Sequence, residues 1–247
     1  MTDYTQDYLL NQRIKIFQPV DGYRASTDAV MLAAMVDKAD NAKILDVGSG
    51  TGAVSLCLAE RFKQANITID GLEIQPQLVE LSNKSAIENG FEFLTFHHCN
   101  IGDSEKTKAL GYCSYDIVIS NPPYSDHDMP SPNSSKATAH NLSNISFDEW
   151  LNFCLKMAKP FGRIYMVNRV EILPRLCSLI KNKAGNLTVL PIYSKPNQVA
   201  KRIIVSFQKD SKAPCRILPP FLMHNENSEH TADAEKILRS GSCFSDL

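Results

Sequence analysis

One stretch of the chain could position a weakly nucleophilic amino group for reaction. It consists of Asn121, Pro122, Pro123 and Tyr124. The side-chain oxygen of Asn121 and the carbonyl of Pro122 both accept hydrogen bonds, and Pro123 has no N–H that would occupy that carbonyl. Acceptors aimed at the hydrogens of an amino group favour its pyramidal form and stabilise the positive charge that forms on nitrogen during attack. Tyr124 could stack on the planar group that carries the amine. Asn-Pro is also common in turns, so the stretch alone is explained more simply as the end of a strand.

A second stretch, "LDVGSGTG" (45–52), contains Gly48, Gly50 and Gly52 around Ser49. An apolar run precedes it and a helical pattern follows it, which predicts a turn from a strand into a helix. Glycine at such a turn lets the backbone bend tightly and lets a ligand approach it closely. A glycine-rich loop by itself is weak evidence, because many nucleotide-binding folds use one.

An acidic residue, Glu73, ends the next expected strand, 21 residues after Gly52. In a Rossmann-like unit, a carboxylate at this position accepts hydrogen bonds from ribose hydroxyls and disfavours a 2′-phosphate. The two signals together predict an adenosine-type cofactor. Asp46, just before the loop, would repel a pyrophosphate and would complement a cationic group.

Strand and helix patterns alternate along the chain, which predicts a mostly parallel sheet covered by helices on both faces. Strands are expected at 43–47, 67–74, 93–100, 115–120, 162–168, 187–194 and 200–208. Helices are expected at 53–62, 76–90, 146–159 and 171–182. The last two strands are joined by too short a loop for a helical crossover, so they should be antiparallel. The expected fold class is α/β: a Rossmann-like, mostly parallel sheet of seven strands with one antiparallel strand.

Two helix starts carry cap signals. Ser146 is followed three residues later by Glu149, which is the pattern of a capping box. A helix near the N-terminus should start around Ser26, with Ser26 or Thr27 as its cap.

Composition excludes several classes of protein. The chain has 247 residues and is 43% hydrophobic, and no apolar run approaches the roughly 18 residues that a membrane span needs. The N-terminus is acidic and polar, unlike a secretory signal. Seven cysteines are scattered without any C-x-x-C pair, which favours a reducing cytoplasm over a disulfide framework or a zinc site, and no metal site is expected.

The net charge of −1 conceals an asymmetry. Residues 160–216 contain eleven Lys and Arg and two acidic residues, a local charge of +9. Charge that is segregated in this way suggests a face for an anionic partner, although a solvated lysine-rich surface is an equal alternative. The candidate contacts are Arg163, Arg169, Lys181, Lys183, Lys195, Lys201 and Arg202.

The chain is expected to form a single domain. Residues 1–40 precede the first strand of the pattern and are too few for a separate core. Residues 41–208 form the expected catalytic core. Residues 209–247 are expected to be a C-terminal appendage or a frayed tail.

The pattern D-x-G-x-G-x-G from Asp46 to Gly52 resembles the cofactor loop of class I S-adenosylmethionine-dependent methyltransferases. The N-P-P-Y stretch that follows a later strand resembles that of amino-methyltransferases acting on adenine N6 or on glutamine amides. A carboxylate fits such a cofactor, because S-adenosylmethionine carries an ammonium and a sulfonium and no pyrophosphate. In an open α/β sheet, both stretches should face one crevice beyond the carboxyl ends of the strands.

Three longer segments resemble the bacterial tRNA (adenine-N6)-methyltransferases that modify valine tRNA beside the anticodon. They are "FQPVDGYRASTDAVMLAA" (17–34), "KATAHNLSNISFDEW" (136–150) and "YSKPNQVAKRIIVSF" (193–207), and the resemblance extends to about residue 240. It implies S-adenosylmethionine as cofactor and N6-methylation of an adenine in the anticodon loop of valine tRNA. The basic segment 160–216 would supply a phosphate-binding surface.

The resemblance also implies site residues. The expected cofactor-binding residues are Asp46, Gly48, Ser49, Gly50, Gly52, Glu73, Ile74, Asn100, Ile101 and Asn121. After the third strand an acidic residue is usual in the family, so Asp103 competes with Asn100. Tyr23, Arg24 and Thr27 would line the cofactor or target pocket. The loop 125–145, with Lys136 and His140, could close over the base.

Other functions remain open at this point. A protein glutamine N5-methyltransferase acting on a release factor would use the same N-P-P-Y logic on an amide, but that group usually has a helical substrate domain ahead of the fold. A DNA adenine methyltransferase usually has a large target-recognition domain. A catalytically silent RNA-binding module would not need Asp46, Glu73 and Asn121.

Overall fold

The computed structural model describes residues 3–22, 24–123 and 145–246. The strands are β1 (Tyr4–Leu9), β2 (Ile14–Pro19), β3 (Lys43–Val47), β4 (Thr68–Glu73), β5 (Leu94–His98), β6 (Tyr115–Ser120), β7 (Ala158–Arg169), β8 (Ala184–Tyr193), β9 (Arg202–Lys209), β10 (Arg216–Ile217) and β11 (Phe221–Leu222). The helices are α1 (Thr27–Ala34), α2 (Ala53–Arg61), α3 (Pro76–Glu88), α4 (Ser104–Ala109), α6 (Phe147–Met157), η1 (Val170–Ile172), α7 (Leu173–Ile180), α8 (Ala232–Glu235), η2 (Lys236–Ser240) and η3 (Phe244–Asp246).

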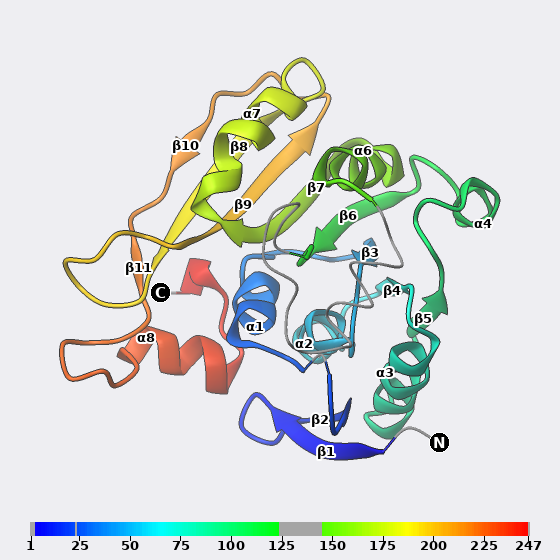
Figure 1. Ribbon diagram of the computed structural model, residues 1–247, viewed down its shortest axis with the longest axis horizontal. Helices are drawn as coiled ribbons and strands as arrows, with labels where there is room; N and C mark the ends of the chain where they lie inside the picture. Colours follow the sequence, from blue (N-terminus) through cyan, green and yellow to red (C-terminus); the bar gives the residue numbers. More distant parts are fainter. Residues whose placement is uncertain (1–2, 23, 124–144, 247) are drawn as a thin grey trace.

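The main sheet has the order β10-β8-β9-β7-β6-β3-β4-β5, and β11 also pairs with β8 (Figure 1). Seven of its strands are those expected from the sequence. Among them β9 is antiparallel to both β7 and β8, and the other pairings are parallel. The α/β fold class and the single antiparallel strand are therefore confirmed. The two-residue strands β10 and β11 extend the edge and were not expected.

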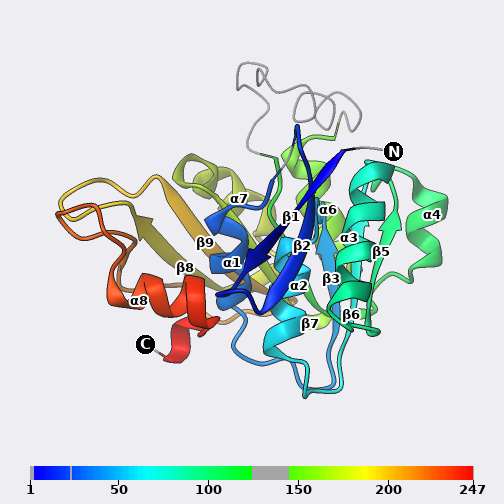
Figure 2. The same ribbon diagram turned by 90° about the horizontal axis from the view of Figure 1, so that it is seen from below.

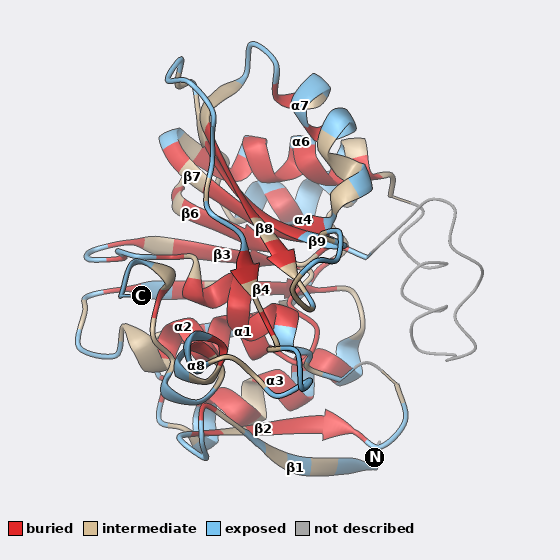
Figure 3. Cartoon of the chain, turned by 90° about the vertical axis from the view of Figure 1, so that its left-hand side faces the viewer, coloured by how far each residue is buried: buried red, intermediate tan, exposed pale blue. Residues whose placement is uncertain are grey.

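Successive side chains along a strand point to opposite faces of the sheet, and both faces are buried (Figure 3). In β6, Ile117 and Ile119 belong to the apolar core that contains α1 and α2. Val118, between them, belongs to the core on the other face, which contains α6 and α7. Parallel strands covered on both faces need such continuous apolar runs.

The N-terminal residues form an antiparallel hairpin of β1 and β2, which the sequence analysis did not predict. Strand β2 packs against α3. A side chain of α3 and that of its C-cap residue join it to the hairpin: the Phe17 N–H donates to Ser85 Oγ (2.9 Å), and Asn89 Nδ2 donates to the Lys15 carbonyl (2.7 Å). Helix α1 starts at Thr27 as expected, but Ser26 at its N-cap makes no side-chain cap bond.

Residues 209–247 were expected to be an appendage or a frayed tail, and the second alternative is wrong for the described residues after Lys209. Strands β10 and β11 pair with β8, and η2 packs against α1. Figure 2 shows α8 and the turns that follow it beside α1. Within the described part of the chain, no helix combines the length and the apolar character needed to cross a bilayer.

Candidate functional site

The glycine loop and the N-P-P stretch leave neighbouring strands of the sheet. Strands β3 and β6 are parallel partners, and Val47 lies opposite Ser120. Continuing the register by one residue places Gly48 beside Asn121, and adjacent strands lie roughly 4.8 Å apart. Asn121 is half-buried, Pro122 is buried and Pro123 is exposed. Tyr124 lies outside the described residues. The carboxyl ends of β3 and β6 therefore bring the two motifs together.

The loop has the backbone shape that its glycines allow. Gly48, Gly50 and Gly52 have φ of 73°, 56° and 82°, in the left-handed region that favours glycine. A Cβ on Gly48 would meet the indole of Trp150 at 2.7 Å, and one on Gly52 would meet the ring of Phe96 at 2.6 Å. The Gly48 and Ser49 N–H groups both donate to the Leu72 carbonyl at 2.9 Å, which ties the loop to β4.

Asp46 is buried at the end of β3, with 1% of its surface exposed. Ser55 Oγ donates to its Oδ2 at 2.7 Å. Burial raises the pKa of this carboxyl to about 7, the Ser55 bonds oppose the rise, and the charge of Glu73 adds to it. The group was expected to be a carboxylate near a cation, and burial shifts it toward the neutral form.

Glu73 lies at the end of β4 and is also buried. Its Oε2 accepts from the Gly50 N–H at 2.9 Å, and its Oε1 accepts from the Gln75 N–H at 2.9 Å. Burial raises the pKa of Glu73, and the backbone N–H groups of Gln75 and Gly50 oppose this rise. Ile74 follows it and accepts a hydrogen bond from His98 Nε2 through its carbonyl (3.0 Å).

Three buried side-chain oxygens at this loop have no hydrogen-bond partner among the described residues: Asp46 Oδ1, Ser49 Oγ and Thr51 Oγ1. Buried polar atoms are rarely left unpaired, and clustered exceptions point to a ligand or to water. The donor set is one carboxyl and two hydroxyls, beside a second carboxyl. It fits a cofactor with an amine and sugar hydroxyls, and it supports the assignment of S-adenosylmethionine to this loop. Thr51 was not among the residues expected from the sequence.

Trp150 of α6 is a further residue that the sequence analysis missed. Its Nε1 donates to Ser120 Oγ at 3.0 Å, and Ser120 Oγ donates to the Val47 carbonyl at 2.7 Å. This chain of bonds joins α6 to the ends of β6 and β3. The capping box of Ser146 and Glu149 is present as predicted and fixes where α6 begins. The sequence signal was thus a tryptophan in the first turns of a capped helix.

The turn after β5 holds the next group of expected residues. Asn100 is half-buried, and its side-chain oxygen accepts from the Gly102 N–H at 2.9 Å. Asp103 instead caps α4, accepting from the N–H groups of Glu105 and Lys106. Ile101 packs at the margin of the core beneath α6 and α7.

The residues expected to line the cofactor or target pocket, or to close over the base, lie partly at the surface and partly outside the described residues. Arg24 is exposed, and its guanidinium donates to Asp7, Thr5 and the Pro19 carbonyl of the hairpin. Thr27 is exposed at the start of α1. Tyr23, and the loop 125–145 with Lys136 and His140, fall outside the described residues apart from Ile145.

The structure does not gather the basic segment on one face. Strands β7, β8 and β9 and helix α7 run back and forth across the sheet, so basic residues alternate between its two ends. Arg169, Lys195, Lys201 and Arg202 lie at the carboxyl end of β7, and Arg163, Lys181 and Lys183 lie toward the other end. In the described parts of the chain, no three His, Cys, Asp or Glu side chains are grouped as a metal site.

Comparison with known proteins places the chain among methyltransferases. A family model described as "Methyltransferase domain" matches residues 38–213. A tRNA1(Val) (adenine(37)-N6)-methyltransferase of Pedobacter heparinus is 31% identical over 196 residues, which are 78% of this chain and 81% of the relative. The enzyme of that name from Aliivibrio fischeri is 33% identical over 169 residues, 68% of this chain and 69% of the relative.

Solved structures share the fold. One described as a predicted O-methyltransferase from Agrobacterium tumefaciens has a TM-score of 0.73 and 19% identity, and the match covers 88% of this chain and 98% of that one. P. horikoshii TYW2 in complex with MeSAdo has a TM-score of 0.57 and 13% identity, covering 85% of this chain and 73% of that one. The fold is that of class I methyltransferases.

Proposed function

Because this chain belongs to the tRNA1(Val) (adenine(37)-N6)-methyltransferase family, we propose that it methylates the exocyclic N6 amino group of an adenine in tRNA. The methyl donor is S-adenosylmethionine. The observation that carries the proposal is the register of β3 and β6, which supports one crevice shared by the glycine loop and Asn121. The substrate that follows from the relatives' name is the adenine at position 37 of valine tRNA, and its place of action is the cytoplasm.

S-adenosylmethionine would be held by Asp46, Ser49, Thr51 and Glu73, and when bound it supplies an electrophilic methyl group on a cationic sulfur. Asp46 and Glu73 complement the positive charge and the ribose hydroxyls, respectively. The three unpartnered oxygens at the loop support this assignment, since they would gain partners from a polar ligand.

Asn121 and Pro122 act on the adenine amino group. Its lone pair is delocalised into the ring, so the nitrogen must become pyramidal before it can attack. The Asn121 oxygen and the Pro122 carbonyl accept hydrogen bonds from its two hydrogens and stabilise the positive charge that develops. Pro122 is buried, which limits competition from water for that carbonyl. The methylated nitrogen is acidic and loses its proton readily, so the residues at this site need no strong general base.

The assignment is tested by following label. The protein is incubated with methyl-labelled S-adenosylmethionine and either bulk tRNA or a release factor, and the RNA is digested to nucleosides. Label is expected in N6-methyladenosine. Label in protein glutamine, without labelled N6-methyladenosine, would show that the same crevice serves an amide and would overturn the tRNA assignment.

The role of Asn121 is tested by Asn121→Ala. We expect the variant to lose about a hundredfold or more in kcat, because removal of one preorganised polar partner of a developing charge costs on that order. Its cofactor Kd, measured by equilibrium dialysis, should stay within about twofold. Asn152→Ala, an exposed change on α6, is the control and should leave kcat unaltered. Loss of cofactor affinity in Asn121→Ala would assign this residue to cofactor binding instead.

A further inference from the structure

We propose that the RNA phosphates bind to basic side chains at one end of the sheet only, the end beside the crevice. These side chains are called the crevice-end cluster, and the rest of the basic segment 160–216 does not take part. The inference rests on the proposed function. The cluster consists of Arg169, Lys195, Lys201 and Arg202.

Strand topology brings the cluster together. Strand β7 ends at Arg169 and β9 begins at Arg202, and the two arginines lie directly opposite each other in the antiparallel pair. The Val170 N–H donates to the Lys201 carbonyl at 3.3 Å, so Lys201 continues the same edge. Lys195 lies on the loop between β8 and β9, the gold loop at the left of Figure 1.

The two facing arginines have an electrostatic cost. Like charges directly opposite each other in a strand pair are destabilising. Asp28 offsets part of this cost: its Oδ2 lies 3.0 Å from Arg202 Nε, and its side chain is 8% exposed. Arg169, Lys201 and Arg202 are exposed. Exposed arginine and lysine side chains that share one edge of the sheet are well suited to meet an anion such as a phosphate.

The cluster is close to the crevice. Ser120 lies opposite Met166 in the pairing of β6 and β7. Arg169 is therefore one strand across from Asn121 and two residues further along, a backbone separation of roughly 8 Å. A nucleotide whose base enters the crevice would have its neighbouring phosphates within reach of these long side chains.

The acidic stretch 225–229, beside Lys195, restricts the path that an RNA backbone can take over this surface. Lys195 Nζ donates to Ser228 Oγ at 2.6 Å, which places the 225–229 stretch beside the β8–β9 loop. That stretch carries Glu226 and Glu229. Its negative charge would repel phosphates, so the backbone is expected to run from Lys195 toward Arg169 and the crevice.

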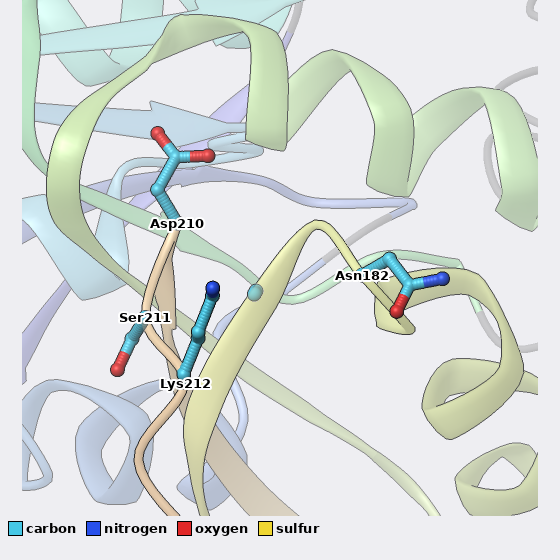
Figure 4. Close-up of a pocket in the computed structure, with 5 residues that line it drawn as sticks. Asn182, Asp210, Ser211 and Lys212 are labelled. Carbon is cyan, nitrogen blue, oxygen red and sulfur yellow. The ribbon is translucent and has the colours of Figure 1, made fainter.

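Lys181 and Lys183, between α7 and β8, and Lys209 and Lys212, at and after the end of β9, lie at the far end of the sheet, and these segments are near the top of Figure 1. Strand β8 has ten residues, so the two ends are roughly 30 Å apart. Some far-end lysines have internal roles: Lys209 Nζ donates to the Ala158 carbonyl at 2.9 Å, and Lys183 Nζ donates to Asn152 Oδ1 at 2.9 Å. A hollow there is lined by Asn182, Ala184, Asp210, Ser211 and Lys212 (Figure 4).

The two ends allow a matched experiment on the full chain. Lys195→Glu with Lys201→Glu alters the crevice end, and Lys181→Glu with Lys212→Glu alters the far end; both pairs change the net charge equally. The crevice-end pair should raise the KM for tRNA roughly tenfold or more. The slope of log KM against log salt concentration should also fall in magnitude by about one to two. The far-end pair should match the wild type. The cofactor Kd should be unchanged in both.

The inference is overturned if the far-end pair weakens tRNA binding as much as the crevice-end pair, or if the crevice-end pair has no effect. Lys195→Gln with Lys201→Gln provides a gentler version, expected to act in the same direction. Failure of the proposed function would look different, because the wild type itself would then place no methyl group in tRNA.

Discussion

Asp46 combines burial, hydrogen bonding to Ser55 and one oxygen without a partner among the described residues in a single side chain. Its place before the glycine loop could be predicted from spacing, because the turn from strand to helix is a local property of the chain. Its environment could not be predicted, since Ser55 and Glu73 surround it only after α2 and β4 pack beside β3. Sequence thus identified the residue, and packing determines its protonation.

The pH dependence of stability should show this. Burial raises the pKa of Asp46 from 3.8 to about 7 in the folded chain, so the folded state holds a proton that the unfolded state releases. The stabilisation is full below about pH 4 and is lost as pH rises to about 7. For the protein without cofactor, the free energy of unfolding relative to Asp46→Asn should fall by about 2–3 kcal/mol between pH 5 and 8. Urea denaturation measures both proteins, and parallel curves would contradict the assignment.

At the scale of elements, α6 is connected to both motif-bearing strands through Trp150. The capping box made the start of α6 predictable, because its two partners lie three residues apart. The partner of Trp150, Ser120, lies 30 positions away, so the bond between them could not be predicted from a local pattern. We expect Trp150 to be a positioning residue that holds the start of the N-P-P stretch against the glycine loop.

Trp150→Phe tests this role. It keeps an aromatic ring and removes the N–H, so the strand ends lose a bond worth about 1 kcal/mol and the Asn121 acceptors lose alignment. We expect kcat to fall about three- to tenfold with the cofactor Kd within about twofold. Phe153→Leu, a buried change on the same helix, is the control and should lower stability without changing kcat. A loss of kcat that merely follows stability in both variants would indicate a structural role.

Other elements show why prediction from sequence was incomplete. The seven long strands were recognisable from continuous apolar runs, which parallel strands buried on both faces require. The β1–β2 hairpin was missed because its turn lacks glycine and proline. Leu10, Asn11 and Gln12 instead adopt positive φ of 47°, 54° and 67°. The polar helix α4 offered no apolar periodicity.

At the scale of the whole molecule, the turn of the N-terminal hairpin contacts the C-terminal residues. Ile237 of η2 is fully buried in the core that also contains α1, and Arg13 Nη2 donates to the Ser240 carbonyl. These contacts join positions more than 200 residues apart, which no local pattern could reveal. We propose that residues 1–247 act as one methyltransferase domain, with 1–40 and 209–247 packed onto the 41–208 core.

Substitution of two isoleucines tests how much the C-terminal residues contribute to the stability of this domain. Ile237→Ala removes a fully buried side chain and should lower the free energy of unfolding by about 2–5 kcal/mol. Ile217→Ala is the matched control, because Ile217 is 72% exposed on β10 and its loss should change stability by about 0.5 kcal/mol or less. Denaturation by urea compares them; equal effects would mean that the C-terminal residues are not part of the cooperative unit.

Trp150 has a further consequence, because it is the single tryptophan of the chain. Its indole lies against Gly48 and donates to Ser120, at the boundary between the glycine loop and the N-P-P stretch. The tryptophan fluorescence of the protein, excited selectively over its tyrosines, therefore originates beside the crevice. Events there can be followed in real time by emission, on the unlabelled wild-type protein and without turnover.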